Sequence, residues 1–253
     1  MSLSEKEHWG SDITMSYHEK QYREPKRSTV AFEKFLLKNT DLNGMILDLC
    51  CGGGAVDVYL AERHPEVRIK GVDIVDNSFE LFDKYAPENI KKRVSLERAD
   101  LYALSEESGR YDGVIMVQTL SWLKNWKEAI ERIIELKPNW FALSSLFYEG
   151  KIEFQVKIQD YERIDKDGKN DEAYYNIYSL PIIKEYLREK GYTVFVAEPF
   201  NIDIDIEKPD GWDMGTYTIK TEDGNRLQVS GAMLMPWYFV YAAKDKEGDK
   251  TKC

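Results

Sequence analysis

Cysteine is scarce in this chain, and its few residues are badly placed for cross-linking. Only three of the 253 residues are cysteine. Cys50 and Cys51 are adjacent in a predicted tight turn, and Cys253 is the last residue of the sequence. This arrangement builds no disulfide framework, and the sequence has no Cys/His spacing typical of a zinc site. We therefore expect no bound metal and a reducing, cytoplasmic environment.

Long hydrophobic runs and basic stretches are also missing. No apolar segment approaches the roughly 18 residues of a membrane-spanning helix, and the polar N-terminus has no signal-peptide core. The formal net charge is −10 and the pI is about 5.0, without the basic stripe that nucleic-acid binders usually carry. The sequence therefore predicts neither a membrane nor a nucleic-acid partner.

What the chain does contain is an apolar segment that ends in an acid, two cysteines and three glycines. It runs from Met45 to Gly54, and an apolar-periodic segment follows. This pattern predicts a buried strand, a tight turn and a helix. Glycines at the turn allow positive φ angles and close approach of a ligand. A second strand over 68–73 ends in Asp73, where an acid can accept hydrogen bonds from a ribose. The sequence therefore predicts a nucleoside-binding βαβ unit.

The glycine spacing distinguishes between two kinds of nucleotide cofactor. The dinucleotide fingerprint G-x-G-x-x-G/A is met by Gly52 and Gly54, but Asp57 stands in the place of the third glycine. A carboxylate at that place would repel a pyrophosphate. Asp48, inside the turn, suits a ligand that carries a cation. The fit to NAD is therefore poor.

At these residues the chain resembles the class I S-adenosylmethionine-dependent methyltransferases. Their first motif is commonly Leu-Asp-x-Gly-x-Gly-x-Gly, and residues 47–54 match it except for Cys50 in the first glycine position. The resemblance implies S-adenosylmethionine as cofactor, with its methionine end at this turn, its ribose on Asp73 and its adenine on Asp100. On sequence alone, Asp100 is equally a candidate helix cap. The full set of cofactor-binding residues that we predict is Asp48, Cys50, Gly52, Gly54, Asp73, Ile74, Asp100, Leu101, Gln118, Tyr17 and Arg23.

Hydrophobic periodicity predicts five strands that alternate with helices, followed by a helix, a strand, a hairpin and a last strand. We therefore predict an α/β fold with a doubly wound, mostly parallel seven-stranded sheet and an antiparallel C-terminal strand. Ligands of such sheets bind at the carboxyl ends of the strands. We expect one domain over 1–253, with an N-terminal arm and helix (1–40), a cofactor-binding core (45–145), an inserted hairpin or lid (148–178) and the C-terminal part of the sheet (179–244). The polar start of the arm, over 1–27, is either loose or a lid over the cofactor.

These features predict a methyltransferase that acts on an O or N atom of a small organic or sugar-like acceptor. His18 is the candidate general base. An equally good interpretation is that His18 is an exposed residue of the N-terminal arm without a catalytic role. The candidate acceptor-binding residues are Trp122, Tyr174, Tyr175 and Tyr178. Their aromatic rings could instead cover the open sheet edge or form a homodimer interface. Two other functions stay open: a protein or RNA methyltransferase, and a nucleoside-binding protein without transferase activity.

Overall fold

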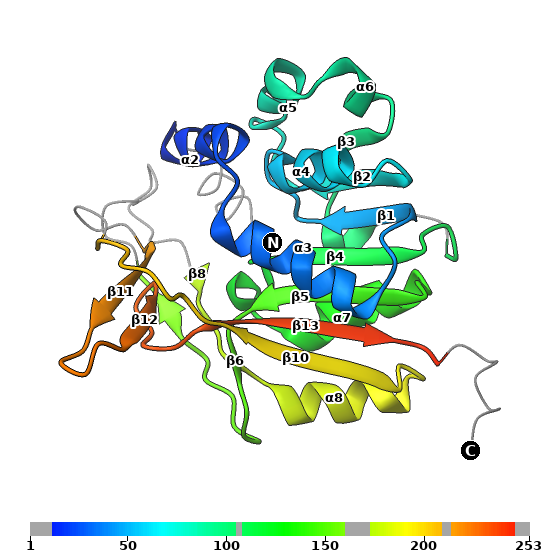
Figure 1. Cartoon of the computed structure of the whole chain (residues 1–253). Coiled ribbons are helices and arrows are strands. Elements are labelled where there is room, and N and C mark those ends of the chain that lie inside the picture. Colours follow the sequence, from blue (N-terminus) through cyan, green and yellow to red (C-terminus); the bar gives the residue numbers. More distant parts are fainter. Residues whose placement is uncertain (1–11, 105–107, 160–172, 209–213, 246–253) are drawn as a thin grey trace.

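A seven-stranded sheet runs through the molecule in the strand order β10-β13-β5-β4-β1-β2-β3 (Figure 1). The computed structural model describes residues 12–104, 108–159, 173–208 and 214–245. Strand β13 pairs antiparallel with both β10 and β5, and the other neighbours in the sheet pair in parallel. The predicted fold class is confirmed. The strands of this sheet are β1 (Gly44–Leu49), β2 (Val67–Asp73), β3 (Val94–Arg98), β4 (Gly113–Val117), β5 (Trp140–Ser145), β10 (Val194–Phe200) and β13 (Trp237–Ala243).

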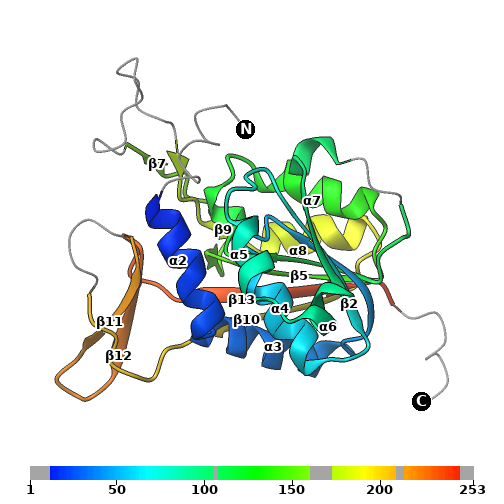
Figure 2. The ribbon, with the colours of Figure 1, turned by 90° about the horizontal axis from the view of Figure 1, so that it is seen from above.

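Helices cover both faces of the sheet because its strands are apolar on both faces (Figure 2). Successive side chains of a strand point to opposite faces. In β1, Leu47 and Leu49 accordingly pack in the cluster of α7 (Trp126–Glu135) and α8 (Leu180–Glu189). Ile46 packs in the opposite cluster, with α3 (Arg27–Asn39) and α4 (Ala55–Arg63). The shorter helices are α5 (Phe79–Tyr85), α6 (Glu88–Lys91), η1 (Leu101–Ala103) and η2 (Leu120–Trp122).

Helix α8 begins and ends as its sequence predicts. Ser179 is the N-cap residue and its Oγ accepts a hydrogen bond from Ile182 N at 3.4 Å. Pro181 lies in the first turn, where its missing N–H costs nothing. Gly191 follows the helix with a φ of 87°, a conformation that favours glycine after a helix C-terminus.

The N-terminal segment contains a helix that the sequence analysis did not predict. Helix α2 (Asp12–Arg23) packs against α4 and α5. The ring of Tyr22 stacks on Tyr85 with centroids 5.5 Å apart. The carboxylate of Glu19 accepts hydrogen bonds from Lys84 Nζ at 3.1 Å and from the Tyr85 hydroxyl. These contacts attach α2 beside the turn that follows β1.

Three short two-stranded sheets accompany the main sheet in the described ranges. The predicted insertion over 148–178 contains an antiparallel pair, β7 (Lys157–Ile158) with β8 (Ala173–Tyr174), and its residues 160–172 lie outside the described ranges. Strand β6 (Phe147–Tyr148) pairs with β9 (Tyr178–Ser179), and the predicted C-terminal hairpin is β11 (Thr216–Lys220) with β12 (Arg226–Ser230). Figure 1 shows α2, β8 and the β11–β12 hairpin at the same end of the main sheet. No helix in the described ranges is long and apolar enough to cross a bilayer.

Candidate functional site

The glycine turn after β1 is held to the end of β2 by the carboxylate of Asp73. Asp73 Oδ2 accepts a hydrogen bond from Gly52 N at 2.8 Å, and Oδ1 accepts one from Val75 N at 3.0 Å. Burial raises the pKa of this carboxyl group, and the backbone donors oppose that rise. A carboxylate has about four lone-pair positions, so Asp73 can accept further hydrogen bonds from a ligand.

The backbone of the turn is left-handed at three positions. The φ angles are 61° at Cys50, 57° at Gly52 and 76° at Gly54. The left-handed conformation at Cys50, the first glycine position of the motif, costs a non-glycine residue about 1–3 kcal/mol. A Cβ atom on Gly52 would lie 2.5 Å from Cε1 of His18. The imidazole of His18 therefore lies directly on the glycine turn.

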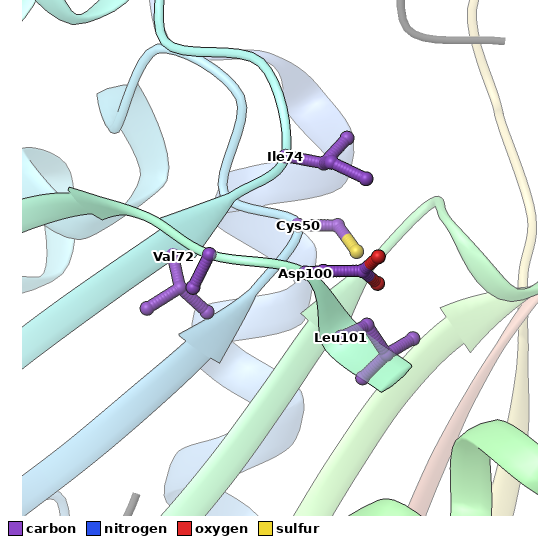
Figure 3. Close-up of a pocket in the computed structure, with 6 residues that line it drawn as sticks. Cys50, Val72, Ile74, Asp100 and Leu101 are labelled. Carbon is purple, nitrogen blue, oxygen red and sulfur yellow. The ribbon is translucent and has the colours of Figure 1, made fainter. Parts of the chain in front are cut away.

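A small hollow opens where the loops after β1, β2 and β3 meet (Figure 3). In Figure 3 the thiol of Cys50 and the carboxylate of Asp100 lie between the side chains of Ile74 and Leu101. Asp100 Oδ1 accepts a hydrogen bond from Tyr102 N at 2.9 Å, so this carboxylate also caps η1, as the alternative interpretation expected. The residues that line the hollow are Cys50, Val72, Ile74, Ala99, Asp100 and Leu101.

Two buried carboxyl groups lie beneath the turn. Asp48 on β1 is 2% exposed and Asp57 in the first turn of α4 is 0% exposed. Burial raises the pKa of Asp57 to about 7; burial and the nearby Asp57 charge raise the pKa of Asp48 well above its usual range. With both groups ionised, Asp48 Oδ1 and both Asp57 oxygens lack hydrogen-bond partners among the described residues. One proton shared between the two carboxyl groups removes this conflict.

The loop between α2 and α3 reaches the end of β4. Lys26 Nζ donates a hydrogen bond to Gln118 Oε1 at 3.3 Å and another to the Tyr17 hydroxyl. The rings of Tyr17 and His18 make an edge contact with centroids 5.3 Å apart. Burial, and then the charge of Lys26, lower the pKa of His18 to about 4. The structure thus brings Tyr17, His18 and Gln118 together, with His18 neutral at physiological pH.

Arg23 lies apart from this group. Its guanidinium pairs with Glu19 at 3.0 Å and donates to the Tyr85 hydroxyl at 3.3 Å, on the exposed side of α2. It is Tyr22, one residue earlier, that contacts the turn: its hydroxyl donates a hydrogen bond to the carbonyl oxygen of Gly53. In this structure α2 is thus attached to the glycine turn through Tyr22, whereas Arg23 joins α2 to α5.

An aromatic cluster lies beside the carboxyl ends of β4 and β5. We use this name for Trp122, Tyr175 and Trp237. The ring centroids of Trp122 and Tyr175 are 4.7 Å apart, and those of Tyr175 and Trp237 are 6.2 Å apart. Methionine side chains pack against the cluster from the C-terminal hairpin region, and they belong to Met214, Met233 and Met235.

The other two predicted acceptor residues lie differently. Tyr178 is buried in the sheet core, and its hydroxyl donates to Leu123 O at 2.5 Å and accepts from Asn176 Nδ2 at 2.9 Å. Tyr174 is half-buried on β8, beside Tyr175 in sequence. Asn176 also donates to Leu123 O and accepts from Val156 N. Tyr178 and Asn176 therefore join the insertion to the loop after β4.

Sequence reasoning missed three residues that shape this site. Lys26 follows a proline before a helix, a pattern that signals a helix start and nothing more. Tyr22 was one of several aromatic residues of the arm. Asp57 was considered only as a departure from the dinucleotide fingerprint, whereas its burial beside Asp48 depends on how α4 packs on β1. In the described part of the chain, no group of three or more His, Cys, Asp or Glu side chains is arranged to hold a metal ion.

The fold and the site define a class of protein. A doubly wound sheet of order β3-β2-β1-β4-β5-β13-β10, with a glycine turn after its first strand and an acid after its second, is the Rossmann-like architecture of class I methyltransferases. Residues 46–139 match the family model described as a methyltransferase domain. Residues 46–139 thus form a methyltransferase domain, and the fold of the chain is similar to that of solved S-adenosylmethionine-dependent methyltransferases. The predicted resemblance to this family is confirmed, and S-adenosylmethionine is the cofactor that the resemblance indicates.

Curated relatives match a little under half of the chain. Malonyl-[acyl-carrier protein] O-methyltransferase from Priestia megaterium is 33% identical over 106 residues, which are 42% of this chain and 37% of that protein. (S)-Coclaurine N-methyltransferase from Thalictrum flavum subsp. glaucum is 25% identical over 122 residues, which are 48% of this chain and 32% of that protein. The matches thus span well under half the length of these relatives.

The fold extends over most of the chain in comparisons with solved structures. Burkholderia thailandensis 1,6-didemethyltoxoflavin-N1-methyltransferase is one example, with a TM-score of 0.52 and 15% sequence identity. The match covers 94% of this chain and 90% of that one, whose structure contains 1,6-didemethyltoxoflavin and S-adenosylhomocysteine. At this identity the likeness concerns the fold.

Proposed function

We propose that this protein transfers the methyl group of S-adenosylmethionine to an O or N atom of a small organic acceptor. One observation carries the proposal: the hollow after β1–β3 and the aromatic cluster after β4–β5 lie at the same edge of the sheet, where His18 contacts the glycine turn and Gln118 follows β4. A donor site and an acceptor site on one edge permit the alignment that in-line methyl transfer requires.

The residues of the hollow fit the adenosine part of the cofactor. Ile74 and Leu101 offer apolar side chains on either side of a planar base, and Asp100 offers a carboxylate to its amino group. Asp73, already fixed by two backbone donors, can accept hydrogen bonds from ribose hydroxyls. The acids beneath the turn favour a cationic methionine end over a pyrophosphate. The cofactor, when bound, supplies an activated methyl group, and the protein positions the acceptor.

The aromatic cluster supports a small acceptor. Aromatic and methionine side chains with few polar groups are typical of sites for small organic molecules. The names of the two curated relatives are those of an O- and an N-methyltransferase, which fits an acceptor atom of either kind. A cytoplasmic location, a homodimer and the absence of a nucleic-acid partner stay predictions from the sequence.

The proposal is tested first by binding and transfer. Calorimetric titration should show binding of S-adenosylmethionine and S-adenosylhomocysteine and none of NAD, because the third glycine of the dinucleotide fingerprint is replaced by the buried Asp57. Incubation of a metabolite extract with methyl-labelled cofactor should then give a labelled small molecule. Comparable affinity for NAD would contradict the cofactor assignment. Binding without any labelled product would favour a nucleoside-binding protein without transferase activity.

The acceptor site is tested with Trp122→Ala. We expect acceptor turnover to fall about 10-fold or more while S-adenosylhomocysteine affinity stays within about twofold, since Trp122 lies in the aromatic cluster and outside the hollow. The matched control is Trp126→Ala, since Trp126 packs on Tyr186 in α8 and should affect only stability. Tyr175→Ala removes a ring that is 1% exposed and should cost about 3–5 kcal/mol of stability, so its turnover is measured per folded molecule. Normal turnover of folded Trp122→Ala protein would show that the cluster is only structural.

A further inference from the structure

Lys26 holds a position at the site that the fold alone does not require. It follows Pro25 in the short link between α2 and α3, and its side chain is half-buried. The ammonium group lies 4.0 Å from the ring centroid of Tyr17 and 3.3 Å from Gln118 Oε1. Gln118 directly follows β4. The loop before α3 thus places a cation at the strand end where the acceptor is expected.

The charge of Lys26 is not neutralised by its described surroundings. The partners seen for its ammonium group are a phenol ring, a phenol oxygen and an amide oxygen, and within the described ranges no carboxylate lies at ion-pair distance. Lys26 is also the N-cap residue of α3, whose first turn contains no acid. Because a helix N-terminus carries partial positive charge, the potential at this point favours an anion.

Gln118 is held in a costly conformation at the same place. Its φ is 56°, in the left-handed region that is unfavourable for a non-glycine residue. Its backbone N–H donates to Ser144 O at 2.8 Å on the neighbouring strand β5, while its side chain meets Lys26. Strain of this kind is frequent at functional sites because surrounding contacts maintain it.

His18, the candidate general base beside this position, is a weak base. His18 is neutral at physiological pH, because burial and the charge of Lys26 lower its pKa to about 4. A group with so low a pKa removes a proton poorly from an alcohol, a phenol or an ammonium ion. The arrangement therefore suits an acceptor that arrives already deprotonated.

We propose that Lys26 binds an anionic oxygen of the acceptor, and that the enzyme is an O-methyltransferase for planar, apolar molecules that carry a carboxylate, phenolate or enolate. This inference rests on the proposed function and names its acceptor class. The aromatic cluster contacts the apolar body of the acceptor, and the cation at Lys26 sets the position of its oxygen. The two positive charges, the ammonium and the cofactor sulfonium, then lie on either side of the negative oxygen.

The transfer needs no proton acceptor. The anionic oxygen forms a bond to the methyl carbon while the carbon–sulfur bond breaks, and the electron pair of that bond goes to sulfur. The negative charge of the acceptor and the positive charge of the sulfonium disappear together, so both products are neutral at the reacting atoms. In this scheme Lys26 lowers the pKa of the acceptor oxygen and holds it in line, which explains how a site with a neutral His18 can methylate oxygen.

Three matched pairs of small aromatic compounds test the proposal: benzoate with benzylamine, phenylacetate with phenethylamine, and 4-nitrophenolate with aniline. Binding to the protein loaded with S-adenosylhomocysteine is measured by calorimetry, and transfer by methyl-labelled S-adenosylmethionine. Wild-type protein should bind and methylate the anion of each pair in preference to the amine. Lys26→Met should reduce both by about 10- to 100-fold, the loss expected for a hydrogen bond to a charged group, while Lys26→Arg should restore part of the transfer.

Controls separate this role from a structural one. Lys20→Met removes an exposed lysine of α2 and should change neither binding nor transfer. Lys26→Met should keep its S-adenosylhomocysteine affinity within about twofold and its melting temperature near that of the wild type. The proposal would be overturned if the anion and the amine of every pair bound and reacted equally, or if neither bound. Methylation of the amines, or full activity of Lys26→Met, would also overturn it. Failure to bind S-adenosylmethionine at all would instead count against the proposed function.

Discussion

Replacement of Asp73 by alanine should weaken S-adenosylhomocysteine binding by about 10- to 100-fold, a loss of about 1.5–3 kcal/mol. The alanine side chain offers no acceptor to the ribose hydroxyls. It also leaves the N–H groups of Gly52 and Val75 without the carboxylate that they now contact at 2.8 and 3.0 Å. The melting temperature should therefore fall as well, because the turn loses its connection to β2. Calorimetric titration and thermal unfolding measure the two effects.

Two further variants make the Asp73 experiment specific. Asp76→Ala removes a nearby exposed acid, whose side chain pairs with Arg98 at 3.7 Å, and should change neither quantity. Asp73→Asn keeps the shape but directs an NH₂ group at one of the backbone donors, so it should bind cofactor less tightly than wild type. If Asp73→Ala binds the cofactor as tightly as wild type, the ribose does not contact this residue.

Asp57→Asn should raise the free energy of unfolding, relative to wild type, as the pH increases. The difference between variant and wild type should be a few kcal/mol more favourable to the variant above pH 7 than near pH 4. The pKa of Asp57 is raised to about 7 in the folded state, against roughly 3.9 for an unfolded chain. Between these values the unfolded state releases a proton that the folded state retains. Wild-type stability from this group is therefore complete near pH 4 and is lost as the pH rises through about 7. The asparagine variant lacks this loss.

The measurement is the difference in unfolding free energy between variant and wild type across pH 4–8. The difference between variant and wild type is used because it cancels the contributions of other carboxyl groups. Groups with a lowered pKa, such as Glu33, make the folded protein more stable as the pH rises, which is the opposite trend. Glu62→Gln on the exposed side of α4 removes a similar charge and should give a flat difference. A flat difference for Asp57→Asn too would mean that Asp48 and Asp57 do not share a proton.

Much of the fold could be predicted because its signals are local. The apolar run before Asp48, the acid at Asp73 and the cap at Ser179 lie within single strands, turns or helix ends. Once the strands are known, right-handed crossovers bring their carboxyl ends to one edge. This rule brings Cys50, Ile74, Asp100 and Leu101 close together, and all four line the observed hollow. Their cofactor-binding role comes from the family resemblance and stays a prediction.

The rest depends on contacts between distant segments. Helix α2 has weak amphipathicity, and it is attached through Tyr22 to Gly53 and through Glu19 to Tyr85, which are 31 and 66 residues away. Lys26 reaches Gln118 across 92 residues. No pattern in the neighbouring sequence predicts contacts between residues so far apart in the chain. The burial of Asp57 is equally hidden, because an acid in the first turn of a helix is ordinarily favourable and exposed.

The position of strand β13 in the sheet determines the order in which the strands can pair during synthesis. Strands β1 to β5 can pair as soon as residues up to Ser145 have left the ribosome, since each has its neighbours among residues already made. Strand β10 cannot join them then, because the strand between it and β5 is β13, at Trp237–Ala243. After β10, about forty more residues must be synthesised before β13 is complete, and until then β10 has no partner strand in the sheet. The unpaired edge of such a strand is prone to pair with other chains, so the interval before β13 arrives is when a nascent chain of this fold most needs protection from its neighbours.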